Sequence, residues 1–420
     1  MLHKSADTEV LFLQGPLGPF FAEFAKYLIG HGHYVHKVNF NGGDDYYYDL
    51  PATNYRGEPK DWRVFLRGYI EEHNIGAIAL YGDCRFYHQE AVKLAKDLNI
   101  KIMVFEEGYL RPDFITLEAN GANNYSEMSF AGMKHYPKHR EETFTVGNSF
   151  VSRMTFASKY FNISYAKRKG FPDYQHHRNL NPMFEGLCWL RSFARKVVYP
   201  SIQHRSLKRL LENQSGNFFV VPLQVFLDNQ LKHHSPHRSI KDFIIEVMES
   251  FAKNAASTDH LLIKHHPEDQ GHINYRRLIK KTAVDLGIKS RVVYAHDLHL
   301  PTFLNHSKGV ITLNSTVGIS ALIHGIPVKT LGRSLMERAG LTSAQSLANF
   351  WKKPGTVDTK RVVQFRNYLL VHGQLNASFY KDIHKGLPNV YRHFYRLLVA
   401  DETSKTVKTT TKATSPQLTI

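Results

Sequence analysis

The stretch from Ile75 to Arg85 has the sequence IGAIALYGDCR, and it decides the fold. Its first seven residues are nearly all apolar and lack the polar alternation of a half-exposed strand. Such a run is typical of a parallel strand that helices cover on both faces. Gly82 and the polar residues after it end the strand in a turn, at the edge where open α/β sheets bind their ligands.

The segments on either side continue a rhythm of strands and helices. Short apolar runs predict further strands at 9–14, 34–40 and 101–105. Amphipathic runs predict helices at 20–30, 62–73 and 87–98. Because strands that alternate with helices form parallel sheets, we expect residues 1–134 to be an N-terminal Rossmann-like domain.

The same rhythm returns in the second half of the chain. Strands are predicted at 218–223, 261–264, 292–295, 310–313 and 327–330, and helices at 240–251, 273–286 and 361–371. These segments predict a second Rossmann-like domain over 213–400, with closing helices. Two such domains that face one another across a cleft form the GT-B glycosyltransferase architecture, although other enzymes also pair Rossmann domains. The predicted fold class is therefore α/β and GT-B-like, with an interdomain cleft and additional helices.

Composition describes a globular and basic chain. Of its 420 residues 42% are hydrophobic, and 54 lysines and arginines stand against 37 aspartates and glutamates, a net charge of +17. A nucleotide or phosphorylated substrate, an anionic membrane surface or nucleic acid would fit that sign. No helix-turn-helix, RRM or zinc-finger pattern is present, so nucleic acid is not an expected partner.

The two cysteines, Cys84 and Cys188, have no metal-ligand spacing and are too few for a disulfide framework. They favour a reducing compartment. No uninterrupted apolar stretch reaches the roughly 18 residues of a membrane span, and no signal peptide is predicted. If the protein meets a membrane, we expect it to lie on the surface.

A connecting segment, 135–212, differs from both domains. Between residues 150 and 210 twelve basic residues stand against Asp173 and Glu185, and aromatic residues are interleaved with them. This mixture suits an anionic lipid interface. A solvated linker whose helices pack on the domains is the alternative. The Thr/Lys/Ser-rich segment 401–420 is expected to be disordered.

Candidate site residues of the first domain follow its predicted strands. They are Gly15, Gly18, Asp44, Asp83, Arg85, Glu107, Gly108 and Arg111. Backbone amides after a strand can receive an anionic group, but tight turns also need glycine. A carboxylate at 106 or 107 could act as a general base on an acceptor hydroxyl, or it could be an ordinary surface acid.

Candidate site residues of the second domain also follow predicted strands. They are Gln224, Asp228, Lys264, His265, His266, Pro267, Asn314, Ser315, Thr316 and Gly318. Asp228 is a candidate nucleophile or charge stabiliser, or a helix cap. The cationic loop and the Ser-Thr pair at a helix start could hold a nucleotide's phosphates, or the pair could serve only as a cap. No third ligand accompanies the histidines, so no metal site is predicted.

These motifs resemble the KpsS/LipB family of bacterial capsule proteins. The matching phrases are LQGPLGPFF at 13–21, HKVNFNGGD at 36–44, GDCR at 82–85, FEEGYLRP at 105–112 and VPLQV at 221–225. Asp228, the loop 264–267 and the segment 314–318 continue the match, which runs in order from about residue 10 to 335.

The resemblance implies a metal-independent glycosyltransferase without a cofactor, which moves β-linked Kdo from CMP-Kdo to lyso-phosphatidylglycerol and starts a capsule linker. It implies retention by double displacement, with Asp228 as nucleophile and Glu107, beside Gly108, as acceptor-side base. Residues that would hold the CMP phosphate and the Kdo carboxylate are Lys264, His266, Pro267, Ser315, Thr316 and Gly318. Implied partners are the anionic inner face of the inner membrane, where the protein would be peripheral and cytoplasmic, a KpsC-type Kdo transferase and the capsule export machinery.

Two alternatives stay open at this point. The protein could be a non-catalytic factor of capsule assembly or export, which binds polysaccharide or the transporter through its basic surface. It could also transfer another sugar from a CMP donor, because the sequence does not distinguish these donors.

Overall fold

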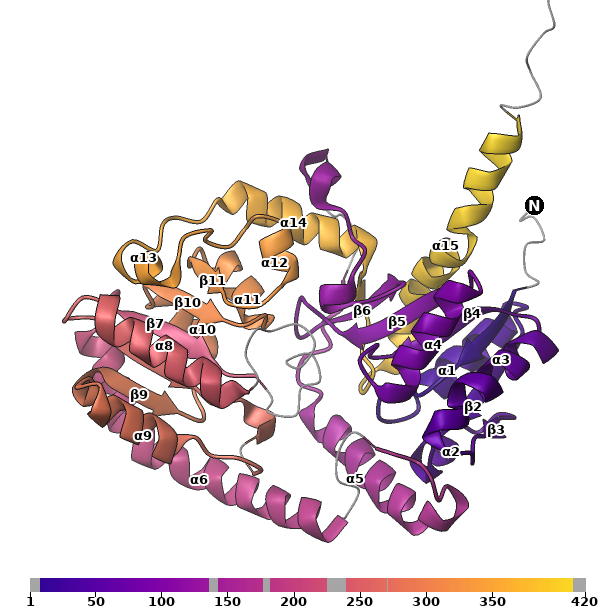
Figure 1. Cartoon of the computed structure of the whole chain (residues 1–420), viewed down its shortest axis with the longest axis horizontal. Coiled ribbons are helices and arrows are strands. Elements are labelled where there is room, and N and C mark those ends of the chain that lie inside the picture. Colours follow the sequence, from indigo (N-terminus) through magenta and orange to yellow (C-terminus); the bar gives the residue numbers. More distant parts are fainter. Residues whose placement is uncertain (1–7, 136–142, 177–181, 225–238, 270, 411–420) are drawn as a thin grey trace, which may run out of the picture. The chain divides into compact units, whose positions relative to one another are not determined.

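The computed structural model describes residues 8–135, 143–176, 182–224, 239–269 and 271–410 (Figure 1). The chain divides into two compact units. The first contains Met1–Glu127, Glu141–His177 and His372–Ile420, and the second contains Met128–Arg140 and Arg178–Val371. Each unit has its own sheet and its own apolar core.

The first unit is built on a seven-stranded sheet with the order β12-β6-β5-β4-β1-β2-β3. Its strands are β1 (Glu9–Phe12), β2 (Val35–Asn39), β3 (Thr53–Asn54), β4 (Ile75–Tyr81), β5 (Lys101–Glu107), β6 (Phe114–Ala119) and β12 (Gln374–Asn376). Neighbouring strands from β5 to β3 are parallel, whereas β6 is antiparallel to both β5 and β12.

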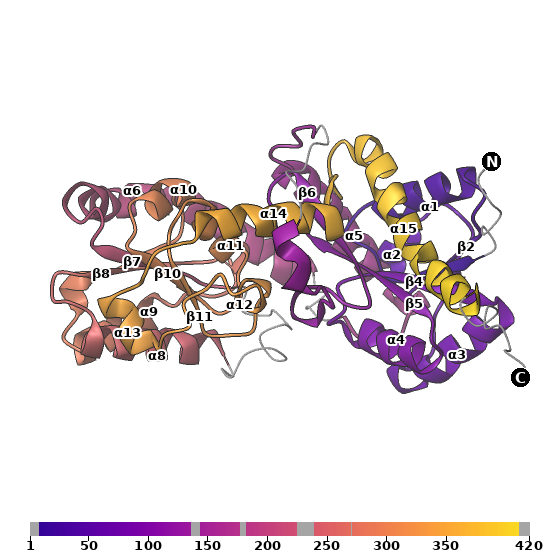
Figure 2. The same cartoon turned by 90° about the horizontal axis from the view of Figure 1, so that it is seen from above.

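Helices cover both faces of this sheet (Figure 2). They are α1 (Phe20–Gly30), α2 (Gly42–Tyr46), α3 (Trp62–Glu72), α4 (Phe86–Asp97), α5 (Phe150–Ala166) and α15 (Ile383–Thr410). Strand β4 explains why: Ala77 and Ala79 enter the core beneath α1 and α15, while Ile78 and Leu80 enter the core beneath α3 and α4. Successive side chains of a strand point to opposite faces, so an uninterrupted apolar run needs two covers.

The second unit has a five-stranded parallel sheet with the order β11-β10-β7-β8-β9. Its strands are β7 (Phe218–Pro222), β8 (His260–Lys264), β9 (Val292–Ala295), β10 (Gly309–Thr312) and β11 (Val328–Thr330). Its helices are α6 (Pro182–Asn213), α8 (Ile240–Asn254), α9 (Arg276–Asp285), α10 (Leu300–Asn305), α11 (Val317–Ile323), α12 (Leu335–Arg338), α13 (Leu347–Lys352) and α14 (Thr359–His372). At the centre of its core, the Trp351 ring contacts Phe219 and Phe251 edge-to-face.

The prediction of two Rossmann-like domains is confirmed, and α1 and β4 have the predicted bounds. The sequence did not predict β6 or β12. Residues 372–400, expected in the second domain, lie in the first unit, because β12 pairs with β6 and α15 packs on α1. The connecting segment 135–212 divides between the units, α5 in the first and α6 in the second.

The remaining expectations concern the end of the chain and the membrane. Helix α15 extends to Thr410, so it includes the first half of the segment 401–420 that was expected to be disordered. Within the described ranges, no helix has the length and apolar character needed to cross a bilayer.

Candidate functional site

In the first unit, four neighbouring parallel strands bring most of the predicted residues to one edge of the sheet. Strands β2, β1, β4 and β5 lie side by side, and the residues at or just beyond their carboxyl ends include Asp44, Gly15, Arg85 and Glu107. This is the edge at which open α/β sheets bind ligands.

Gln14 connects the loops at this edge. Its Nε2 lies 3.1 Å from Asp44 Oδ2, 3.0 Å from the Tyr160 hydroxyl and 2.9 Å from the Tyr174 hydroxyl. Its Oε1 accepts a hydrogen bond of 2.6 Å from Arg85 Nη1. The side chain is buried, so these bonds fix the Arg85 guanidinium relative to the ends of β1 and β2. Sequence reasoning singled out the glycines after Gln14 and not Gln14 itself.

Asp44 is a structural anchor. Tyr160 of α5 donates a 2.8 Å hydrogen bond to its Oδ1, and the Phe40 amide donates to Oδ2 at 3.1 Å. Burial, together with the charge of Asp44, raises the pKa of the Tyr160 phenol well above its usual value, so this group stays a donor. Asn41 caps α2 by accepting from the Asp44 amide at 3.0 Å. The contacts of Asp44 therefore hold α5 against the strand ends.

Close packing accounts for the glycines in the predicted site. A Cβ atom on Gly15 would lie 2.8 Å from the Phe21 ring, and one on Gly18, which has φ of +106°, would lie 2.6 Å from the Phe156 ring. On Gly108 it would lie 2.0 Å from a backbone oxygen of β6. At all three positions any larger residue would displace its neighbours.

The two consecutive glutamates that end β5 occupy different environments. Glu107 Oε1 accepts hydrogen bonds from the Tyr380 hydroxyl at 3.0 Å and the Tyr81 hydroxyl at 3.4 Å. Burial raises the pKa of Glu106 to about 8, and the negative charge of Asp83 contributes. Glu106 is therefore mostly protonated at neutral pH.

Asp83 and Arg111 differ in burial and in the hydrogen bonds that they make. Asp83 is buried and accepts a 2.9 Å hydrogen bond from the Ala122 amide, so it holds the loop after β6. Its burial raises its pKa above the usual value. Arg111 is exposed, and its Nε donates to the Gly108 oxygen at 3.2 Å.

Two arginines stand over the tyrosines of this edge. The Arg85 guanidinium lies 5.2 Å from the centre of the Tyr81 ring, and that of Arg153 lies 5.6 Å from the Tyr380 ring. Arg153 belongs to α5, and the sequence marked it only as one of many basic residues. Its position depends on the docking of α5, which no local pattern predicts.

In the second unit, Gln224 and Asn314 join two strand ends. The Gln224 amide nitrogen donates to Asn314 Oδ1, which links the loop after β7 to the loop after β10. Gln224 Oε1 is buried and accepts no hydrogen bond from the described residues. Lys264 ends β8, which lies between β7 and β9 in the sheet. Its Nζ donates to the His265 backbone oxygen at 3.3 Å, and burial lowers the pKa of Lys264.

The structure separates the two histidines of the cationic loop. His265 is fully buried, and its Nδ1 lies 2.7 Å from the Tyr294 hydroxyl. Burial lowers the pKa of His265 to about 4, so the ring is neutral at physiological pH. His266 is partly exposed, beside Pro267 at the start of a short helical turn. A ligand that arrives from solvent can therefore reach His266 but not His265.

The residues before α11 form a compact turn. Ser315 Oγ accepts a 3.3 Å hydrogen bond from the Val317 amide, whereas the Thr316 side chain makes no capping hydrogen bond. A Cβ atom on Gly318 would lie 2.8 Å from Met336 of α12, so Gly318 permits close packing there.

Asp228 lies outside the described residues. Among the residues that the structure describes, no group of three or more His, Cys, Asp or Glu side chains could hold a metal ion.

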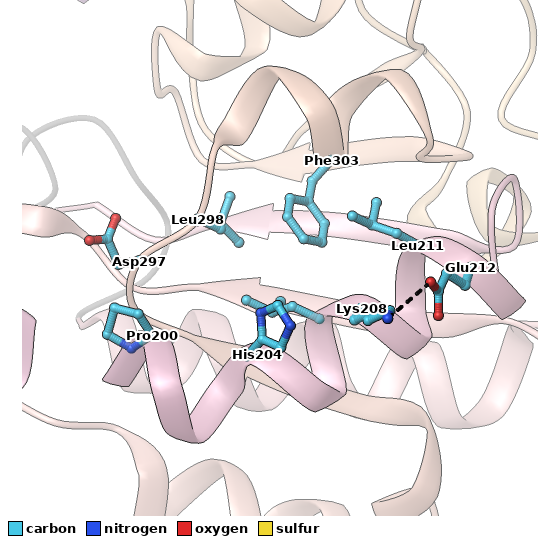
Figure 3. A pocket seen from close by; sticks show the side chains of 9 residues that line it. Pro200, His204, Lys208, Leu211, Glu212, Asp297, Leu298 and Phe303 are labelled. Atoms are coloured by element: carbon cyan, nitrogen blue, oxygen red, sulfur yellow. Dashed lines mark ion pairs between the residues drawn. The ribbon is translucent and has the colours of Figure 1, made fainter. Parts of the chain in front are cut away.

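A cavity of about 390 Å³ lies elsewhere in the second unit, between α6, α10 and the loop after β9 (Figure 3). Leu207, Leu211 and Phe303 give it apolar walls, and Lys208 pairs with Glu212 at its side at 3.7 Å. None of the predicted site residues lines it.

Comparisons with known proteins cover most of the chain. The model of a family described as "Capsule polysaccharide biosynthesis protein" matches residues 76–380. The "Capsule polysaccharide export protein KpsS" of Escherichia coli is 39% identical over 88% of this chain and 96% of its own. The "Capsule polysaccharide modification protein LipB" of Neisseria meningitidis serogroup A is 37% identical over 91% of this chain and 94% of its own. A solved structure, the β-Kdo 2,7 transferase KpsC of Thermosulfurimonas dismutans, aligns with 92% of this chain and 99% of its own, at 13% identity and a TM-score of 0.43.

Proposed function

Because the chain belongs to the capsule polysaccharide biosynthesis protein family, we propose that it is a retaining glycosyltransferase which adds β-linked Kdo from CMP-Kdo to lyso-phosphatidylglycerol. The product would begin the linker between a lipid and a capsular polysaccharide. Support comes from the family, from relatives named for capsule polysaccharide export and modification, and from the motif resemblance.

The observation that carries the proposal is the environment of Glu107. Two tyrosine hydroxyls hold one oxygen of its carboxylate, and the described residues donate no hydrogen bond to the other. A carboxylate held in this way can accept the proton of an acceptor hydroxyl. The guanidinium groups of Arg85 and Arg153, over the adjacent tyrosines, would attract an acceptor that carries a phosphate.

The second unit would hold the donor. CMP-Kdo carries a phosphate and a carboxylate, and both need cationic or amide partners. Lys264 and His266 supply cationic or donor groups at the end of β8, and Gln224, Asn314 and Ser315 supply polar groups at the ends of β7 and β10. The arrangement suits a negatively charged sugar nucleotide.

We assign the nucleophile to Asp228 on the motif resemblance alone. Its carboxylate would attack the anomeric carbon of Kdo while the bond to the CMP phosphate oxygen breaks, and CMP would leave. The acceptor hydroxyl, as it loses its proton to Glu107, would then attack the same carbon and release Asp228. Two inversions give net retention.

Mass spectrometry tests the proposal directly. Purified protein is incubated with synthetic lyso-phosphatidylglycerol, CTP, Kdo and a CMP-Kdo synthetase, with and without EDTA. We expect a Kdo-sized mass increase that survives EDTA. Asp228→Asn and Glu107→Gln should abolish or strongly reduce it, whereas the exposed controls Asp285→Asn and Glu58→Gln should not. No mass increase, with the donor shown to form, would contradict the proposal.

The name of the Escherichia coli relative favours a second candidate, a non-catalytic factor of capsule export. Capsule that persists in cells carrying Asp228→Asn would support this candidate.

The identity of the donor is tested by replacing Kdo and its synthetase with another CMP-sugar in the mass-spectrometric assay. We propose that the protein acts at the cytoplasmic face of the inner membrane, beside a KpsC-type Kdo transferase.

A further inference from the structure

Helix α6 exposes an apolar stripe on its outer side. Met183, Leu187, Leu190 and Val197 are between 62 and 79% exposed. They are separated by four, three and seven residues, and at 3.6 residues per turn this spacing places them on one side of the helix. We call these four residues the outer stripe.

The opposite side of α6 is fixed to its own unit. Cys188, Gln203 and Leu210 are buried, and Gln203 bonds both the Tyr294 oxygen and the His296 ring at the end of β9. The backbone at Cys188 approaches Gly271 so closely that a Cβ atom there would lie 2.0 Å from the Cys188 oxygen. The helix therefore cannot rotate to bury its outer stripe without breaking these contacts.

This arrangement reverses the usual pattern of a surface helix. A helix on a globular protein normally buries its apolar side and exposes its polar side. Here the packed side includes a glutamine and a cysteine, and the exposed side is apolar. An apolar surface of this extent marks a place where another apolar surface binds.

The charges around the outer stripe indicate which kind of surface it binds. From residue 183 to 209 the chain has six basic residues and one acidic residue. Arg205 and Arg209 are exposed, about two and three turns beyond the outer stripe, and Arg191 is exposed at its border. An anionic bilayer offers acyl chains below a layer of phosphate groups, so it matches both the apolar stripe and its basic borders.

We propose that the outer stripe of α6 binds an anionic membrane surface, with the helix parallel to the bilayer plane. Met183, Leu187, Leu190 and Val197 enter the boundary between head groups and acyl chains, and the arginines pair with phosphates. The inference depends on α6 alone, so it stands whether or not the transferase activity is found.

Tryptophan fluorescence offers a direct measurement. The chain has three tryptophans, of which Trp62 and Trp351 are fully buried, whereas Trp189 lies on α6 and is 39% exposed. Addition of phosphatidylglycerol vesicles to the full-length protein should therefore shift the emission to shorter wavelength through Trp189. Phosphatidylglycerol with brominated acyl chains should quench it, and Trp189→Phe should remove both effects.

Vesicle flotation measures the affinity of matched variants. Leu187→Ser, Leu190→Ser and Val197→Ser together should weaken binding by at least about tenfold. The control combines Val64→Ser, Ile323→Ser and Val363→Ser, three exposed apolar residues outside α6, and should bind normally.

A second pair of variants tests the charge. Arg205→Gln with Arg209→Gln should weaken binding roughly 30-fold. Lys352→Gln with Lys360→Gln, two exposed lysines elsewhere, should have little effect. Vesicles of phosphatidylcholine alone should bind the wild-type protein weakly.

Three results would overturn the proposal. One is wild-type protein that does not float with anionic vesicles. Another is flotation without any change in Trp189 emission, which would place the contact elsewhere. The third is wild-type protein that does not bind vesicles and that light scattering shows to be a dimer, which the serine variant dissociates. That result would make a second copy of the chain the partner of the outer stripe.

Discussion

Replacement of Glu106 by glutamine should stabilise the first unit at alkaline pH and have little effect at acidic pH. Burial raises the pKa of this carboxyl from its usual 4.5 to about 8, and Asp83 adds to the shift. Between these pH values the folded protein keeps a proton on Glu106 that the unfolded chain has lost. The free energy of unfolding therefore falls as pH rises from about 4.5 to about 8.

The size of the pKa shift sets how far the free energy of unfolding falls. One pKa unit corresponds to about 1.4 kcal/mol, which gives an upper limit of about 5 kcal/mol for the loss. Glu106 is partly exposed, so we expect solvent to reduce the loss to about 2 to 3 kcal/mol. Glutamine has the same shape and no charge, and its oxygen can still accept from the Glu107 amide, as Glu106 does at 3.3 Å.

The assay needs a signal from the first unit alone. In a background with Trp189→Phe and Trp351→Phe, the buried Trp62 is the remaining tryptophan, and it belongs to that unit. Urea unfolding followed by its fluorescence at pH 5 and pH 9 gives both free energies. Glu71→Gln, at an exposed position on α3, is the control. Parallel pH profiles for Glu106→Gln and the wild type would refute the reasoning.

Three further substitutions test contacts within the two units. Lys308→Met leaves the buried Asp259 carboxylate, now paired at 3.0 Å, without its cation, and should cost the second unit about 3 kcal/mol in urea unfolding; a loss below about 1 kcal/mol would contradict a buried pair. Tyr160→Phe removes the donor to Asp44 and should lower the first unit's free energy of unfolding by about 1 to 3 kcal/mol, with faster proteolysis of α5. Gly108→Ala should lower the melting temperature by several degrees, because its Cβ would overlap a backbone oxygen; unchanged calorimetry would show that the turn relaxes.

The sequence predicted the elements whose signal is local. Strand β4 is a continuous apolar run and α1 is a long amphipathic one, so their bounds could be predicted. Strand β12 has three residues and no pattern, and it exists because Gln374 pairs with Thr116 across 258 positions of sequence. Local periodicity contains no information about such a partner.

The candidate site shows the same division. The loops after the strands were predicted, because topology alone brings them to one edge. The distinction between Glu106 and Glu107, and between His265 and His266, depends on which neighbours surround each side chain in three dimensions. The anchoring role of Asp44 also depends on a distant neighbour, because the Tyr160 hydroxyl that bonds it lies 116 residues away in the sequence.

The return of residues 372–410 to the first unit has a consequence for biosynthesis. The second unit ends at Val371, so all its residues have been synthesised by that position. The first unit still lacks its edge strand β12 and helix α15, which places Phe394 against Phe24. On the ribosome, the half of the protein that begins the chain therefore finishes folding last. Premature termination after residue 371 would leave β6 as an open edge beside an uncovered aromatic core, a form prone to aggregate and be degraded.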